Sequence, residues 1–172
     1  MSKNGFTLLE VLISVILLTM LALIATPSLN QTYRNWQFNN EFRILIADLS
    51  LTRHTAISHN QRVIMQPLDQ WEDGWVVFID TNDNQQFDAS DIFIKQAQPL
   101  THSRVKTAKT LQKYISYAGS GEARFVSSKS PGGMMIGNLL ICPNNAHSPN
   151  KKIIIAKGGR IRTQTNSTRQ CD

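Results

Sequence analysis

The hydrophobic pattern divides the chain into an apolar start, an amphipathic middle and a series of short alternating segments. A polar leader, residues 1–5, runs into an apolar segment from Phe6 to Thr26 that is followed by Pro27. A helix of that length, at about 1.5 Å per residue, spans roughly 30 Å, the thickness of the hydrocarbon core of a bilayer. Residues 6–27 are therefore predicted to form a helix that can cross a membrane.

Beyond Pro27 the apolar residues recur at three- and four-residue steps with polar residues between them, a pattern typical of an amphipathic helix. Residues 28–60 are predicted to continue the first helix, with a kink at Pro27, and to end at Asn60 and Gln61. Trp36 is expected in the core, the alternative being a membrane interface. The other positions expected on the buried face are Phe38, Phe42, Leu45, Leu49, Thr52 and Ala56.

From residue 61 onward, short runs of β-branched and aromatic residues alternate with Gly, Asn, Asp and Pro. Segments this short predict strands of an antiparallel sheet. A long helix packed on such a sheet is an α+β architecture, with residues 61–172 as one β-rich globular domain that ends in a basic tail. The expected strands are residues 62–65, 74–79, 91–95, 114–117, 123–126, 137–142, 151–157 and 160–164.

Two cysteines, Cys142 and Cys171, lie late in the chain, without zinc-type spacing. They predict a disulfide if the domain is exported, and two free thiols if it faces the cytoplasm. Closing a loop of about 30 residues would stabilise the fold by roughly 3–4 kcal/mol.

Positive charge is concentrated in the C-terminal half. Residues 1–92 carry 5 Lys/Arg against 10 Asp/Glu, whereas residues 93–172 carry 13 against 2. Such segregation indicates a surface field that attracts an anionic partner, the alternative being a basic surface kept for solubility.

Gly158-Gly159 predicts a two-residue hairpin turn, in which Lys157 would face Arg160 and Arg162 would share the face of Arg160. The planar guanidinium of arginine can donate two hydrogen bonds to the oxygens of one phosphate. This hairpin is therefore a candidate for contacts to a nucleic-acid backbone without base readout. The alternative is a strand edge protected by charge. The candidate DNA-binding residues are Arg160, Arg162, Lys157, Lys151, Lys152 and Arg169.

An Asp- and Asn-rich loop lies between two predicted strands. Its oxygens have the spacing of an EF-hand loop, but Gln85 replaces the turn glycine and Asp91 the final Glu. A hydrogen-bonded turn is therefore favoured over calcium. The oxygens belong to Asp80, Asn82, Asn84, Asp88 and Asp91.

Enzymatic chemistry is not expected, and no cofactor is implied. The four histidines follow no metal-ligand spacing, and there is no nucleophile elbow, Walker loop or carboxylate pair.

One carboxylate, Glu10, interrupts the first apolar run, and a charge inside lipid marks a functional position. A secretory signal is cut after its hydrophobic region, whereas the polar-to-apolar junction Gly5-Phe6 precedes it. Cleavage there would create an amine at Phe6, four residues from Glu10, that could pair with its carboxylate. The alternative is a plain signal anchor with one tolerated Glu.

The string G-F-T-L-L-E-V-L-I at residues 5–13 closely resembles the processing site of type IV prepilins and pseudopilins. The resemblance implies that a prepilin peptidase cuts between Gly5 and Phe6, that Phe6 is methylated, and that Glu10 docks the subunit against neighbouring pilins. The segments L-T-R-H-T-A-I at 51–57, W-x-x-G-W-x-V-F-x-D at 71–80 and G-R-I-R at 159–162 resemble the GspH/FimT branch.

That branch implies a FimT-like minor pilin that binds extracellular DNA in natural transformation. The protein would cross the bacterial inner membrane once, with its C-terminal domain in the periplasm and outside the cell when the pilus assembles. The alternative is a structural minor pilin, or a pseudopilin of type II secretion, without DNA binding.

Overall fold

The computed structural model describes residues 7–126, 132–144, 149–166 and 171, and for residues 22–29 and 166 it describes the backbone alone. The chain divides into two compact units, residues 1–37 and residues 38–172. Each unit is described by itself, and the predicted leader lies outside the described residues.

One helix, α1 (Leu8–His59), begins in the first unit and ends in the second. Thr7 caps its start, because its hydroxyl oxygen accepts the backbone N–H of Glu10 at 3.3 Å. The backbone stays helical through Pro27. At the other end Asn60 has a φ of 50°, and the N–H groups of Asn60 and Gln61 bond back to Ile57 and Ala56, a Schellman motif. The predicted end of the helix is confirmed.

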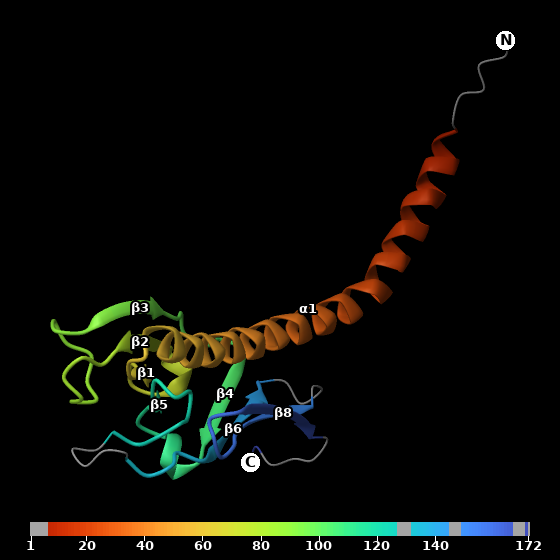
Figure 1. The fold of residues 1–172 in the computed structure, drawn as a ribbon. Helices are drawn as coiled ribbons and strands as arrows, with labels where there is room; N and C mark the ends of the chain where they lie inside the picture. Colours follow the sequence, from red (N-terminus) through yellow and green to blue (C-terminus); the bar gives the residue numbers. More distant parts are fainter. Residues whose placement is uncertain (1–6, 127–131, 145–148, 167–170, 172) are drawn as a thin grey trace. The chain divides into compact units, whose positions relative to one another are not determined.

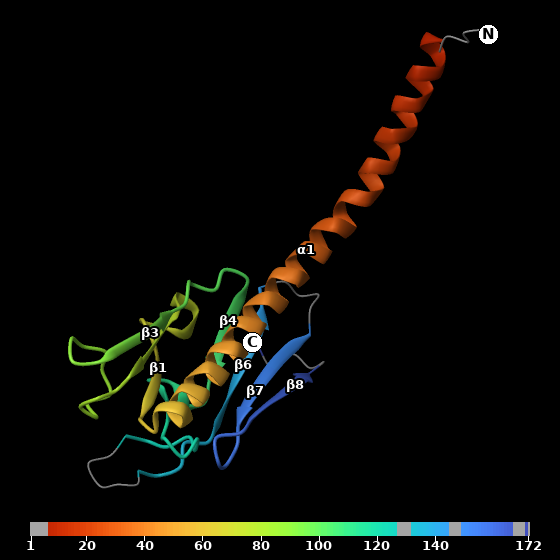
Figure 2. The same cartoon turned by 45° about the horizontal axis from the view of Figure 1, so that its top comes forward.

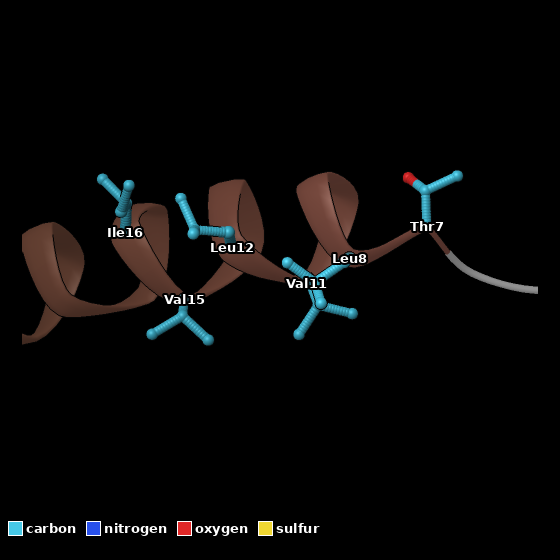
Figure 3. Close-up of a pocket in the computed structure, with 6 residues that line it drawn as sticks. All are labelled: Thr7, Leu8, Val11, Leu12, Val15 and Ile16. Carbon is cyan, nitrogen blue, oxygen red and sulfur yellow. The ribbon is translucent and has the colours of Figure 1, made fainter.

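The described apolar side chains of the first unit are exposed along α1. Thr7, Leu8, Val11, Leu12, Val15 and Ile16 line a shallow apolar pocket on the first turns (Figure 3). Across the part of the chain that the structure describes, no helix combines the length and the apolar character that crossing a membrane requires. The predicted span of residues 6–27 also includes Phe6 and the side chains of residues 22–27, which lie outside that part, so it stays a prediction.

The expectation that Trp36 lies in the core is wrong. Its side chain is 60% exposed and stacks on Tyr33 at a ring distance of 6.3 Å. Two residues before Phe38 on a helix with 3.6 residues per turn, Trp36 lies on nearly the opposite face from the buried positions.

The second unit contains two four-stranded antiparallel sheets. Sheet A has the order β3-β2-β1-β5 and sheet B the order β4-β6-β7-β8. The strands are β1 (Val63–Pro67), β2 (Trp75–Ile79), β3 (Ile92–Gln96), β4 (Ser103–Thr107), β5 (Ile115–Tyr117), β6 (Gly137–Pro143), β7 (Asn150–Ile155) and β8 (Ile161–Asn166). Short 3-10 helices η1 (Trp71–Asp73) and η2 (Lys109–Leu111) precede β2 and β5.

The C-terminal part of α1 lies across both sheets, with sheet A on one side and sheet B on the other (Figures 1 and 2). The six positions predicted for its buried face, Phe38 to Ala56, are all 9% exposed or less, which confirms the amphipathic pattern. All of them except the polar Thr52 form one core with the inward-facing residues of both sheets, including Met65 and Trp75 of sheet A and Leu139 and Ile153 of sheet B.

Two polar residues of α1 attach the helix to the strands. The buried Asp48 accepts the indole N–H of Trp75 at 3.0 Å and pairs with the ammonium of Lys95 at 2.5 Å. Glu41 accepts hydrogen bonds from the β3–β4 connection. Burial raises the pKa of Glu41, but the bonds from Ser103 Oγ and the backbone N–H groups of Thr101 and His102 outweigh burial, so its pKa lies below the usual value.

Three expectations about strands are corrected. The strands form two sheets where one was expected, and β4 was not among the expected strands. Residues 123–126 do not form the expected strand, because they make only isolated bridges, from Ala123 to Tyr117 and from Arg124 to Met134. The other expected strands exist with shifted ends.

Candidate functional site

The β7–β8 hairpin has a different turn from the one predicted. Ile155 pairs with Ile161, and the N–H of Ala156 donates to the carbonyl of Arg160 at 2.9 Å, which leaves the three-residue turn 157–159. Lys157 therefore lies in the turn and does not oppose Arg160. A two-residue turn would pair Ile155, which is fully buried, with Arg162 and would draw that arginine towards the core.

The turn is anchored to the body of the domain. The guanidinium of Arg53, on α1, donates to the carbonyls of Gly121 at 2.9 Å and Gly158 at 3.4 Å. Gly159 packs so closely on this support that an added Cβ would overlap the carbonyl oxygen of Gly121 and lie 3.0 Å from the ring of Tyr117. Both turn glycines have positive φ, 83° at Gly158 and 75° at Gly159. The hairpin is therefore held in a fixed position on α1 and the 118–122 turn.

The two glycines provide a matched test of this anchoring. Gly158→Ala is expected to destabilise the protein by about 1 kcal/mol, because alanine is disfavoured at positive φ. The loss is limited to this backbone strain, since an added Cβ at this position meets nothing within 4 Å. Gly159→Ala is expected to cost about 2–3 kcal/mol, since the same strain is joined by overlap with backbone. Urea unfolding of both variants measures the difference, and equal losses would contradict the proposed anchoring.

Basic side chains gather on the outer face of sheet B, the face turned away from α1. Residues directly opposite each other on neighbouring strands point to the same side of a sheet. Lys106 pairs with Leu140, Leu140 with Lys152, and Lys152 with Gln164, so this row crosses all four strands. By alternation Arg104 and Arg162 join the same face, and Arg160 precedes Arg162 by two residues. We call Arg104, Lys106, Lys152, Arg160 and Arg162 the basic face.

The basic face spans about 15 Å from β4 to β8, given strand spacings of about 4.8 Å. Arg104, Lys106, Arg160 and Arg162 are exposed, and Lys152 is half-buried. None of the described residues on this face of sheet B is acidic. Arg104, Lys152, Arg160 and Arg162, with Lys106 among them, therefore place a positive potential over one side of the described sheet.

The predicted residue Lys151 lies on the opposite side of sheet B. It pairs with Ile141 and Thr165, bonds to the side-chain oxygen of Asn39, and has its ammonium 4.6 Å from the centre of the Phe42 ring. Burial lowers the pKa of Lys151, and the positive charge of Arg43 adds to this effect. Lys151 therefore supports the packing of sheet B on α1 and is not part of the basic face.

The remaining predicted cations have different positions. Lys157 is exposed in the hairpin turn beside the basic face, and Arg169 lies outside the described residues. Sequence reasoning missed Arg104 and Lys106 because it did not identify β4. The alternation Ser103-Arg104-Val105-Lys106, with buried and exposed positions in turn, is the signal that could have found them.

The Asp- and Asn-rich loop is closed by its own hydrogen bonds. The carboxylate of Asp88 accepts the side-chain amides of Asn82 and Asn84 together with the backbone N–H and hydroxyl of Ser90. The bonds from Ser90, followed by those from the two amides, lower the pKa of Asp88 to about 2. Asp91 accepts the backbone N–H groups of Thr81 and Asp88. These bonds favour the turn over the calcium loop.

No group of three or more His, Cys, Asp or Glu side chains that could hold a metal ion occurs among the described residues. His54 and His59 are exposed on α1, His102 bonds to Glu41, and His147 lies outside the described residues. The structure thus brings together no catalytic arrangement from the described histidines.

The predicted disulfide between Cys142 and Cys171 is confirmed, with α-carbons 5.9 Å apart. At the other end of the chain Glu10 is exposed in the first turn of α1, where its negative charge complements the helix dipole. Gly5 and Phe6 lie outside the described residues, so cleavage between them stays a prediction.

Residues 42–159 match the family model described as Type II transport protein GspH. The chain belongs to the GspH family. Residues 1–26 also match the model of the prokaryotic N-terminal methylation motif. The GspH family comprises type IV minor pilins and pseudopilins, which are structural subunits, and the resemblance stated from the sequence motifs is confirmed.

Solved structures support the same fold. Two crystal forms of the type IV minor pilin FimU from Pseudomonas aeruginosa match with TM-scores of 0.55 and 0.54 at 17% and 18% identity. The matches cover 71% of this chain and 84% and 88% of the FimU chains. At this identity they show the α+β pilin fold alone. A search of curated proteins gives no match.

Proposed function

We propose that this GspH-family protein is a minor pilin that binds extracellular DNA through the basic face of sheet B and so supports DNA uptake in natural transformation. The observation that carries the proposal is the gathering of five cations on one face of a sheet whose described strands contain no Asp or Glu. The candidate contacts are Arg160 and Arg162, with Lys152, Arg104 and Lys106. Lys157 extends the basic region into the hairpin turn, and Arg169 stays a candidate from its charge in the sequence.

The arrangement suits a phosphate backbone. Arg160 and Arg162 are exposed side chains of one strand face, about 7 Å apart at two-residue spacing, close to the separation of successive phosphates along a strand of DNA. Hydrogen-bonding side chains such as Gln164 lie on the same face of the sheet. No aromatic side chain lies among the residues of the basic face, so contacts to phosphate would dominate and binding would be largely independent of sequence.

The salt dependence of binding tests the proposal directly. The full chain, in micelles of a non-ionic detergent, is titrated with a fluorescent DNA duplex at several salt concentrations. With four or five phosphate contacts, the logarithm of the binding constant should fall against the logarithm of salt concentration with a slope of about −4. Absence of binding at low salt, or binding that does not respond to salt, would rule the proposal out.

The family model's own description, Type II transport protein, favours a second candidate: a structural pseudopilin of protein secretion that does not bind DNA. A deletion strain separates the two functions. Loss of transformation with normal protein secretion supports DNA uptake, whereas the reverse pattern supports the pseudopilin.

Assembly would be the same in both cases. We propose that prepilin peptidase cuts between Gly5 and Phe6, that the helix of residues 6–27 anchors the protein in the inner membrane, and that Glu10 contacts other pilins in the filament. The match to the methylation motif over residues 1–26 supports processing at this site. The globular domain would then face the periplasm, and the cell exterior after assembly.

A further inference from the structure

A second candidate site lies on sheet A, away from the basic face. The outer face of sheet A carries a small apolar cluster of Ile64, Val76, Phe78 and Val126, against which Tyr114 packs. Gln66 continues this face along β1, opposite Val76. Beside it is a polar pocket of about 320 Å³, within the size range of small-ligand sites. Its lining consists of Gln66, Asn84, Gln85, Gln86, Lys113 and Tyr114.

One wall of the pocket is fixed by the β2–β3 loop. Asp80, 4% exposed, accepts the backbone N–H groups of Asn84 and Gln85, each at 3.2 Å. The side-chain oxygen of Asn84 in turn accepts the backbone N–H of Gln86 at 2.7 Å. Gln85 has a φ of 70°, a conformation that costs a non-glycine residue free energy and persists where the surroundings enforce it. The loop is therefore built to hold Gln85 and Gln86 in one place at the pocket.

The polar groups that line the pocket have unused hydrogen-bonding capacity. Among the described residues, the side-chain amides of Gln66, Gln85 and Gln86 and the ammonium of Lys113 make no hydrogen bond or ion pair. They come from three separate segments: β1, the β2–β3 loop and the segment before β5. Convergence of such groups on one hollow, beside an aromatic side chain, is typical of a site that recognises a small polar ligand.

The chemistry of the lining selects the class of ligand. Each primary amide offers two donors and a carbonyl acceptor, so it suits neighbouring groups that both donate and accept, as the hydroxyls of a sugar ring do. An anionic ligand is disfavoured, because Lys113 is the one cation among the described lining residues and the adjoining loop carries Asp80, Asp83, Asp88 and Asp91. We propose that this pocket binds a neutral sugar ring of a saccharide. The proposal is independent of DNA binding.

Saturation-transfer NMR on the full chain tests it. The protein is placed in dodecylphosphocholine micelles, which contain no sugar, and irradiated in the presence of about 10 mM cellobiose or N,N′-diacetylchitobiose, suited to a Kd of about 1 mM. The native chain should transfer saturation to the ring protons of at least one sugar. Gln66→Ala and Gln86→Ala should each weaken the transfer about threefold or more, because each removes hydrogen bonds to the ligand.

Gln98→Ala is the matched control, since Gln98 is an exposed glutamine between β3 and β4, outside the pocket lining. It should keep the native signal, and thermal unfolding should show that all three variants fold. Absence of transfer from the native chain to both sugars would overturn the proposal, and so would equal transfer in all variants. Excess cellobiose should leave DNA affinity unchanged, because the basic face lies on sheet B.

Discussion

The Arg160→Glu, Arg162→Glu double variant is expected to bind duplex DNA roughly a thousandfold more weakly than the native chain at low salt. Each arginine lost removes one phosphate contact and its counterion release, and each glutamate adds repulsion of the duplex. A thousandfold change corresponds to about 4 kcal/mol of binding free energy. The salt slope should flatten by about 2, one for each lost contact. Fluorescence anisotropy at several salt concentrations measures both quantities.

Lys113→Glu provides a control, because it makes one such charge reversal beside sheet A and away from the basic face. At physiological salt, where the field of an exposed charge is screened within about 8 Å, a decrease of less than about threefold is expected for this control. The Arg104→Glu, Lys106→Glu pair, on the far edge of sheet B, should weaken binding at least tenfold if DNA crosses the whole face. If the Arg160/Arg162 variant and the native chain bind DNA with equal affinity, the hairpin does not contact DNA.

The helix was predictable from the sequence because its signals are local. The spacing from Phe38 to Ala56 placed the buried face correctly, and Asn60 ended the helix because asparagine accepts the positive φ of a Schellman motif. Trp36 was misplaced because its residue type was given more weight than its angular position on the helix.

The hairpin shows where local reasoning was insufficient. Gly158-Gly159 by itself is typical of a two-residue turn, but the register is decided by burial of Ile155 and its pairing with Ile161. The alternation of apolar residues at Ile153 and Ile155 already indicates which face of this strand is buried. Lys151 lies two residues before Ile153, so the same alternation places it on the inner face.

The extent of the basic face depends on long-range pairing. Lys106 and Lys152 share a row only because β4 and β7 both pair with β6, at sequence separations that no short-range pattern specifies. The polar pocket on sheet A likewise combines β1, the β2–β3 loop and the segment before β5, and Gln66, Gln86 and Lys113 form no motif in the sequence.

Replacing both Cys142 and Cys171 by alanine is expected to lower the free energy of unfolding by about 3–4 kcal/mol. The crosslink joins residues 29 positions apart, and its loss returns the entropy of that loop to the unfolded chain. Cys142 is buried on β6 opposite Arg104 and so shares the outer side of sheet B with the basic face, to which it connects the end of the chain.

Urea unfolding of the native and doubly substituted chains measures this loss, and the native chain treated with a thiol reductant should give nearly the same value. Reductant should leave the double variant unchanged, which separates loss of the crosslink from other effects of the reagent. Cys171→Ala alone keeps the Cys142 side chain on β6, so it should lose nearly as much as the double variant if the crosslink dominates. A loss below about 1 kcal/mol would mean that the unfolded chain is already compact and that the disulfide serves to position the tail.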